Sequence, residues 1–323
     1  MRLTTVGTGT VTPSPSRVCA GHLVTTGEVS VLLDCGSGVV HRLARAGVDW
    51  MAITHVAITH FHADHLSDLA FLIFAWRHGA AQPRTAPIDI VGPPGIDALL
   101  TRFADAFGAW VREPGYPVRI TETAPGAVVE LGGDVRLSAF KVPHTEESVA
   151  YDVVHGGRRV VYTGDTGFDE GLGRWAAGCD LLLAECSLPD DREMAIHLTP
   201  SRCGDLAAVA RPRTLVLTHF YPPVEQVDIR GIVHERFDGS LVLAEDGTVW
   251  AWGENEHGQL GDGTKEQKAS PVKVQGFSGV VARCSLENPE KPTVLIIFDR
   301  EKKKIKPWTL DMAEEEGFKI QFA

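Results

Sequence analysis

One short run restricts the fold of this chain more than any other feature, because four metal-ligating side chains fall within six residues: His60-Phe61-His62-Ala63-Asp64-His65. The apolar segment 56–59 predicts a strand that leads directly into it. Imidazole and carboxylate are the ligands of hydrolytic zinc sites, which leave one position open for water. Alternation along an extended chain would point His60 and His62 to one side, and the next turn would bring Asp64 and His65 around a second ion. The run therefore predicts a metal site at the end of a strand.

The rest of the first 240 residues alternates short apolar segments with amphipathic ones. Helices are expected around 41–44 and over 66–76, where Ser67 and Asp68 suit a first turn. Strands are expected at 3–6, 29–33, 56–59, 88–91, 135–140, 160–162, 181–184 and 215–218. Alternation of this kind is typical of an α/β domain.

Composition excludes several classes of protein. The longest strongly apolar run, 69–76, is far too short to cross a membrane, and the first residues lack the apolar core of a secretion signal. Six cysteines occur without a Cys-x-x-Cys pair, so neither a disulfide framework nor a zinc finger is indicated. The net charge of −11 argues against a protein that holds nucleic acid by charge alone. We therefore expect a cytoplasmic protein without a membrane partner.

Basic residues divide the chain near residue 240. Residues 1–240 contain 19 Arg and 1 Lys, whereas residues 241–323 contain 2 Arg and 9 Lys. Folding does not impose such a switch, because Arg and Lys are often interchangeable on a protein surface even though the two side chains differ physically. We interpret the chain as two pieces of different origin, with a hydrolase-type domain at 1–240, a glycine-rich segment at 241–284 and an unassigned tail at 285–323.

The first piece resembles the metallo-β-lactamase superfamily, and within it the ribonuclease Z-like branch. Besides the histidine run, the matching segments are 7–10 (Gly-Thr-Gly-Thr), 32–36 (Leu-Leu-Asp-Cys-Gly), 142–144 (Val-Pro-His), 162–167 (Tyr-Thr-Gly-Asp-Thr-Gly), 197–200 (His-Leu-Thr-Pro) and 217–219 (Leu-Thr-His). They occur in the family's order over residues 1 to about 246. The resemblance implies an αββα sandwich with a small β-rich appendage at its C-terminal end.

The same resemblance implies a pair of metal ions, zinc in the first place, with manganese or iron as alternatives. His60, His62 and His144 would hold one ion, Asp64, His65 and His219 the other, and Asp165 would bridge them. Two such ions lower the pKa of a shared water, so that hydroxide forms without a strong base.

Other residues receive roles from the same resemblance. The carboxylate of Asp64 indicates the phosphoesterase side of the family and counts with His197 as catalytic. His197 is the candidate general acid or phosphate contact, since its pKa lies near working pH. Asp34 and Glu185 are candidates for orienting ligand histidines, although Asp34 is equally well explained as a strand-end turn residue.

The pattern departs from ribonuclease Z proper in two places. Residues 184–186 read Ala-Glu-Cys, where that enzyme carries a His-Glu pair, and no glycine- and proline-rich arm for transfer RNA occurs around 117–120. We therefore expect a hydrolase of small phosphodiesters, with sulfate esters, lactones and thioesters as alternatives and nucleic acid as a less favoured partner. A dimer is compatible with the sequence.

The second piece resembles one repeat of the regulator of chromosome condensation family, over about 240–284. The turn Asp246-Gly247 is expected to join two strands, and glycines follow at 253, 258, 261 and 263. Members of that family are seven-bladed propellers that bind proteins. A single repeat cannot bury its own apolar face, so we expect no propeller, and either a sheet packed on the first domain or a poorly ordered end. A scaffold protein that uses this segment while its hydrolase domain is vestigial is the competing hypothesis.

Overall fold

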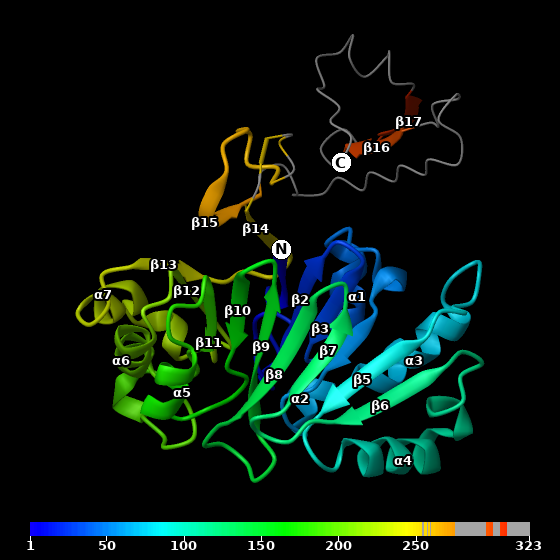
Figure 1. The fold of residues 1–323 in the computed structure, drawn as a ribbon, viewed down its shortest axis with the longest axis horizontal. Coiled ribbons are helices and arrows are strands. Elements are labelled where there is room, and N and C mark those ends of the chain that lie inside the picture. Colours follow the sequence, from blue (N-terminus) through cyan, green and yellow to red (C-terminus); the bar gives the residue numbers. More distant parts are fainter. Residues whose placement is uncertain (254, 257, 259, 275–294, 300–303, 309–323) are drawn as a thin grey trace.

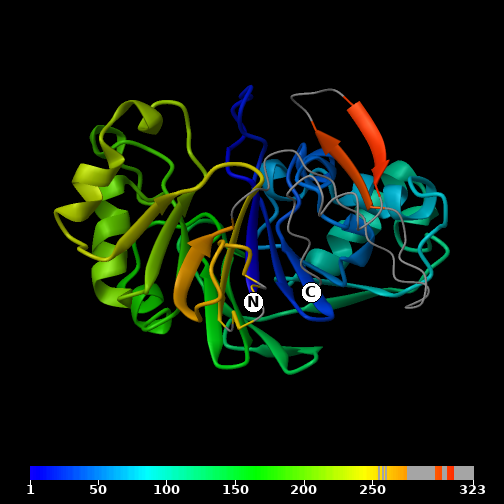
Figure 2. The same cartoon turned by 90° about the horizontal axis from the view of Figure 1, so that it is seen from above.

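The computed structural model of the protein describes residues 1–253, 255–256, 258, 260–274, 295–299 and 304–308. Two sheets face one another, and helices cover the outer side of each (Figures 1 and 2). One apolar core lies between the two sheets, and two further cores lie between each sheet and the helices that cover it. The αββα sandwich expected from the sequence is therefore confirmed.

The first sheet has the order β15-β14-β1-β2-β3-β4-β5-β6. Strands β3 to β6 run parallel to one another, so their carboxyl ends meet at one edge of the sheet. The bounds are β1 (Arg2–Gly7), β2 (Gly21–Thr26), β3 (Val29–Leu33), β4 (His55–Ala57), β5 (Ile88–Gly92), β6 (Val118–Glu122), β14 (Thr248–Gly253) and β15 (Lys268–Lys273).

The second sheet has the order β13-β12-β11-β10-β9-β8-β7. Strands β10 to β13 are parallel, whereas β7 to β9 are antiparallel neighbours. The bounds are β7 (Val128–Gly132), β8 (Val135–Lys141), β9 (Val149–His155), β10 (Arg158–Tyr162), β11 (Leu181–Glu185), β12 (Thr214–Thr218) and β13 (Ser240–Leu243). The buried parallel strands are nearly continuous apolar runs, as expected when both faces of a sheet are covered.

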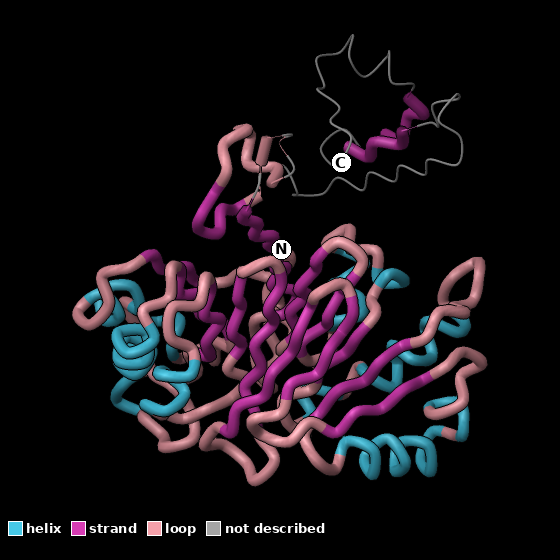
Figure 3. Tube along the Cα trace, viewed as in Figure 1, coloured by secondary structure: helices cyan, strands magenta, loops and turns pink. Residues whose placement is uncertain are grey.

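Helices of the first half of the chain pack on the first sheet and helices of the second half pack on the second. Figure 3 shows the helices in cyan beside the magenta strands. The bounds are α1 (Val39–Arg45), α2 (Ala63–Leu66), α3 (Leu69–His78), α4 (Ile96–Phe107), α5 (Glu170–Trp175), α6 (Pro200–Ala210) and α7 (Ile229–His234), with 3₁₀ turns η1 (Trp50–Ala52), η2 (Ala109–Val111), η3 (Asp190–Arg192) and η4 (Val224–Gln226). None of the helices in the described parts of the chain is long and apolar enough to span a membrane.

The helix expected over 66–76 is corrected in one respect. Residues 63–66 form the separate turn α2, and α3 begins only at Leu69. Asp68 does not cap α3 with its side chain, because its carboxylate accepts a hydrogen bond of 3.1 Å from the backbone N–H of Val40 instead. That bond ties the end of the histidine run to helix α1.

The strands expected on either side of Asp246-Gly247 exist, but they do not form a hairpin. Strand β13 pairs in parallel with β12 in the second sheet, and β14 pairs antiparallel with β1 in the first. The turn therefore crosses from one sheet to the other. Gly247 adopts a left-handed φ of 75°, which glycine reaches without steric cost.

Contacts of Asp246 explain why the turn crosses between the sheets. Its carboxylate accepts hydrogen bonds from the backbone N–H groups of Thr8, at 2.9 Å, and Val18, at 2.7 Å. It also lies 3.1 Å from the guanidinium of Arg42. These contacts hold the turn against the loop that follows β1, so the chain continues beside β1 rather than back along β13.

Strand β14 contributes to two cores at once. Trp252 is only 1% exposed and belongs to the core between the two sheets. Val249 and Ala251, on the opposite face, pack with Leu260 and Val274 in a small core of their own. The described part of the repeat-like segment thus extends the first sheet beside β1, which is one of the two arrangements expected from the sequence, and Figure 1 shows β14 and β15 rising beside the N-terminus.

The tail contains one antiparallel pair among the described residues. Strand β16 (Leu295–Asp299) pairs with β17 (Lys304–Trp308) in a sheet of their own. Residues 275–294, which include the end of the segment resembling a repeat, lie outside the described residues, as do residues 300–303 and 309–323.

Candidate metal centre

Four strand ends from both sheets deliver the predicted ligands to one place. The histidine run follows β4 of the first sheet, whereas His144, Asp165 and His219 follow β8, β10 and β12 of the second. His219 comes directly after β12 and has a left-handed φ of 59°, which few residues other than glycine adopt. The side chain of His219 there lies against Asp64 and Asp165.

A first group of ligand atoms comes from His60, His62, His144 and Asp165, and these atoms all lie within 4.8 Å of one another. His144 Nε2 is 3.1 Å from His62 Nδ1. Oδ2 of Asp165 is 4.0 Å from His60 Nε2 and 3.8 Å from His144 Nε2. Three imidazoles and one carboxylate thus face a common point.

A second group comes from Asp64, His65 and His219 and meets the same 4.8 Å limit. His219 Nε2 is 3.4 Å from Oδ2 of Asp64. The other oxygen of Asp165, Oδ1, is 3.2 Å from His65 Nε2 and 3.3 Å from His219 Nε2. Asp165 therefore lies between the two groups, with one oxygen toward each.

Several donor atoms of this cluster form no hydrogen bonds with one another, and their chemistry matches that of divalent-cation ligands. Nε2 of His60, His65 and His219 and Oδ1 of Asp165 are buried and have no hydrogen-bond partner, although they lie close together. Buried polar atoms without partners are costly and rare in native proteins. Two cations, one in each group, would satisfy every one of these atoms. The residues present therefore fit a metal centre.

The charges of the cluster favour the metal-binding protonation states of His60 and Asp165, whereas for His65 burial lowers the pKa but Asp165 and Asp34 outweigh it and raise that pKa well above its ordinary value. Burial, together with the charge of His65, holds the pKa of His60 well below its ordinary value, which keeps its imidazole neutral. Burial alone raises the pKa of Asp165, but His219, His65 and His60 outweigh it and hold that pKa well below the usual range. Neutral imidazole beside an ionised carboxylate is the donor set that zinc and similar ions take.

Asp34 supports His65 from behind. Its Oδ2 lies 2.8 Å from His65 Nδ1 and accepts a 2.9 Å hydrogen bond from the hydroxyl of Tyr162. Thr59 donates both its N–H and its hydroxyl to the same carboxylate. These bonds orient the His65 ring so that Nε2 points toward Asp165. Asp34 also has a left-handed φ of 59°, so it is both the strand-end turn residue and the partner of a histidine.

Glu185 holds His197 at the side of the cluster. Its two carboxylate oxygens lie 3.1 and 3.2 Å from His197 Nδ1, and one of them accepts a 2.6 Å bond from the N–H of Thr166. Burial alone lowers the pKa of His197, but the hydrogen bond and charge of Glu185 outweigh it and raise that pKa to about 9. The His197 ring is 4.9 Å from that of His144 and 6.3 Å from that of His219, between centroids. His197 therefore faces both groups from one side.

Some supporting residues are not identified by sequence reasoning. The hydroxyl of Ser187 contacts Glu185 and lies 2.9 Å from His219 Nδ1, so it links the two. The carbonyl of Ile196 lies 3.0 Å from His144 Nδ1. A lone serine after a strand and a backbone carbonyl leave no distinctive signal in a single sequence. Tyr162 lies within a recognised motif and is the one supporting residue that the sequence could have suggested.

The sequence matches two family models. Residues 30–220 match a model described as a beta-lactamase superfamily domain, and residues 246–285 match a regulator of chromosome condensation repeat. The two matches meet close to the change in basic residues near 240.

Relatives and solved structures agree with the first match. The chain is 30% identical over 275 residues to a ribonuclease Z of Mycolicibacterium gilvum, covering 76% of this chain and 94% of the relative. A ribonuclease Z of Mycobacterium bovis is 29% identical over 274 residues. The fold is similar to that of YhfI, a metallo-beta-lactamase fold protein from Bacillus subtilis, with a TM-score of 0.67 and 24% identity over 77% of this chain and 98% of that protein. It is also similar to the short form of human tRNase Z, with a TM-score of 0.64 and 25% identity over 78% of this chain and 99% of that protein.

Proposed function

From the premise that this chain belongs to the beta-lactamase superfamily, as a ribonuclease Z-like metal-dependent hydrolase, we propose that it hydrolyses small phosphodiesters at a centre of two divalent ions, zinc in the first place. The observation that carries the proposal is the position of Asp165, with one oxygen toward each of two groups of ligand-type side chains. Two ions held in this way would activate water at neutral pH and neutralise charge on phosphoryl oxygens.

The ligand assignment proposed for this centre follows the two groups. His60, His62 and His144 would hold one ion; Asp64, His65 and His219 would hold the other; Asp165 would contact both. Asp34 and Ser187 would keep the rings of His65 and His219 in the binding orientation through their Nδ1 atoms. All seven ligand positions are of a metal-binding type, which argues against a vestigial domain that serves only as a scaffold.

His197 is proposed to act on the leaving group. Glu185 holds Nδ1, so the free atom of the ring is Nε2, and the ring is half-buried beside both ligand groups. From there Nε2 would contact a phosphoryl oxygen or donate a proton to the departing oxygen. His197→Ala should therefore slow a diester with an alkoxide leaving group far more than one with a 4-nitrophenolate leaving group. Equal loss on both substrates would contradict the proton-donor role.

Two features support a small substrate. Only residues 112–117 separate η2 from β6, so no long arm extends at that place. The chain also carries a net charge of −11, which disfavours extended contact with a polyanion. A panel of phosphodiester, sulfate ester, lactone and thioester substrates tests the choice, and preferential turnover of any of the last three would overturn the phosphodiester proposal.

Metal content and activity together test the centre itself. The purified protein should contain about two equivalents of divalent metal and cleave bis(4-nitrophenyl) phosphate, losing both on dialysis against a chelator and regaining both when zinc is restored. Asp64→Ala should lower metal content and abolish cleavage, whereas Asp105→Ala, an exposed aspartate on α4, should change neither. Metal-free protein that retains turnover would exclude the proposal.

A further inference from the structure

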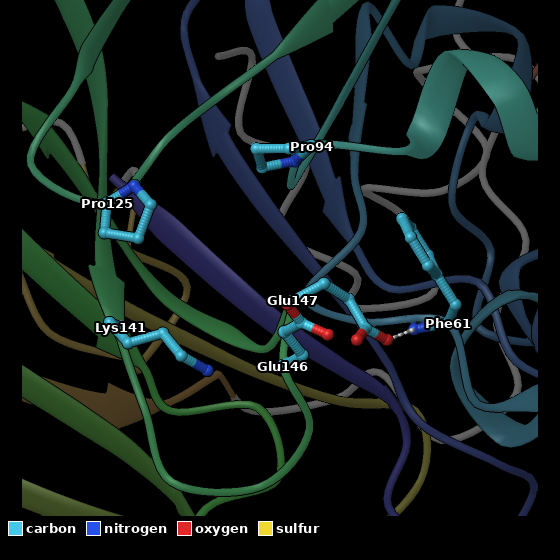
Figure 4. Close-up of a pocket in the computed structure, with 6 residues that line it drawn as sticks. All are labelled: Phe61, Pro94, Pro125, Lys141, Glu146 and Glu147. Carbon is cyan, nitrogen blue, oxygen red and sulfur yellow. Dashed lines mark hydrogen bonds between the residues drawn. The ribbon is translucent and has the colours of Figure 1, made fainter.

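A pocket of about 430 Å³ opens beside the histidine run. Figure 4 shows Phe61 and Pro125 on opposite sides of it, with Pro94 above and the glutamates between; its lining is Phe61, Pro94, Pro125, Lys141, Glu146 and Glu147. Phe61 lies between His60 and His62 in the chain, and Glu146 follows His144 by two residues. Phe61 and the two glutamates thus belong to loops that carry proposed metal ligands, whereas Pro94 and Pro125 belong to the loops after β5 and β6. The volume is within the range of small-molecule sites.

The polar side of this pocket carries two carboxylates and one ammonium, so its net charge is negative. Nζ of Lys141 donates to three backbone carbonyls, those of Val142 at 3.0 Å, Thr145 at 2.6 Å and Ser148 at 3.3 Å. Its three N–H groups are therefore committed to holding the loop. Two carboxylates remain, and among the described residues Glu146 accepts no hydrogen bond.

These charges decide which part of a substrate enters. A phosphate would be repelled by the carboxylates and would find no free donor on Lys141. A neutral group that donates hydrogen bonds would be attracted. The remaining walls are the ring of Phe61 and two prolines, which offer flat apolar surfaces.

We propose that this pocket binds the nucleobase of a nucleotide diester, stacked on Phe61, with an exocyclic amino group donating to Glu146. The inference rests on the proposed phosphodiesterase function and names its substrate class. Stacking on an aromatic ring is tolerant of base identity, whereas the carboxylate selects bases with an amino group, such as adenine, over uracil. The scissile phosphate would then lie on the metal side of Phe61.

A pair of substrates with the same leaving group tests the subsite apart from the chemistry. The 4-nitrophenyl ester of adenosine 5′-phosphate should be cleaved with kcat/KM roughly tenfold above methyl 4-nitrophenyl phosphate, the size expected for one stacked base. Phe61→Leu should bring the ratio of the two kcat/KM values close to one. Glu146→Gln should reduce the preference for the adenosine ester over the uridine ester. Phe107→Ala, an exposed phenylalanine on α4, should leave both ratios unchanged.

Binding supplies a readout that does not depend on turnover. Calorimetry should detect adenosine binding to the full-length protein, weaker by roughly tenfold in Phe61→Leu and absent for ribose. If the adenosine ester and the methyl ester were cleaved with equal kcat/KM and adenosine did not bind, the nucleobase subsite would be overturned while the phosphodiesterase proposal stayed in place. Adenosine binding without any diester turnover would overturn the phosphodiesterase proposal while leaving the binding pocket in place. Preferential binding of glycerophosphocholine over adenosine would assign the pocket to a cationic head group and would also overturn the nucleobase proposal.

Discussion

The buried polar groups around Asp165 and those around Asn255 make a useful comparison. Around Asp165, four buried nitrogen and oxygen atoms have no hydrogen-bond partner. Asn255, also fully buried, accepts from the N–H of Leu260 and donates to Asp262 and Thr264. One cluster is satisfied by the chain itself and the other is not. The complete cluster serves the fold of the repeat-like segment, and the incomplete one is shaped for a ligand from outside.

The largest effect is expected from removal of the carboxylate of Asp165, which lies between the two groups. Asp165→Asn should lower kcat/KM on bis(4-nitrophenyl) phosphate roughly 10⁴-fold, because loss of metal removes several kcal/mol of transition-state stabilisation. Metal analysis should show less than two equivalents, and circular dichroism should show an intact fold. An Asp165→Asn protein with full metal content and activity would mean that the incomplete cluster is not the centre.

The second largest effect is expected for Trp252, which links the repeat-like segment to the first domain. Trp252→Ala should lower the free energy of unfolding by about 3–5 kcal/mol, because its side chain fills the core between the sheets although it lies in the repeat-like segment. Urea denaturation measures the change, and Phe107→Ala, 58% exposed, is the matched surface control. A Trp252→Ala protein as stable as that control would show that β14 is only loosely attached.

Asn255→Ala removes the central side chain of the cluster that the chain satisfies by itself. It should cost about 1–3 kcal/mol, since Leu260 and Thr264 would lose their partner in a buried place. Diester cleavage should stay unchanged, because Asn255 follows β14 at the end of the sheet where β1 begins, whereas the histidine run lies where β1, β3 and β4 end. Faster proteolysis within 254–274 at constant activity is the expected result; reduced activity would imply coupling between the clusters.

The smallest effect is expected on the surface. Lys273 lies 3.7 Å from Glu245, with side chains 56% and 71% exposed, and so joins β15 to the junction only through solvent-screened charge. Lys273→Ala should change the free energy of unfolding by less than about 0.5 kcal/mol. A larger loss in thermal denaturation would show that surface pairs, rather than Trp252, hold the segment to the sheet.

The local parts of the site were predictable because they are dense in the sequence. Four ligand-type residues within 60–65 need no knowledge of the fold, and the strand before them is recognisable from its apolar residues. His144, Asp165 and His219 became candidates only through the resemblance, since each is an isolated residue after a strand. The hairpin expected at 246–247 was wrong because the Asp246 carboxylate bonds to Thr8 and Val18, partners that local turn preferences do not include.

The sequence by itself determined the chemical types of the proposed ligands, the α/β alternation and the switch from arginine to lysine near residue 240. Only the tertiary structure decided that Asp165 lies between two ligand groups, that Glu185 and Ser187 support His197 and His219, and that β14 completes a sheet of the first domain. The physical reason is that ligand type is a property of each side chain. Convergence depends instead on which strand ends meet, and long-range pairing sets that, as for His62 and His144, which are 82 residues apart.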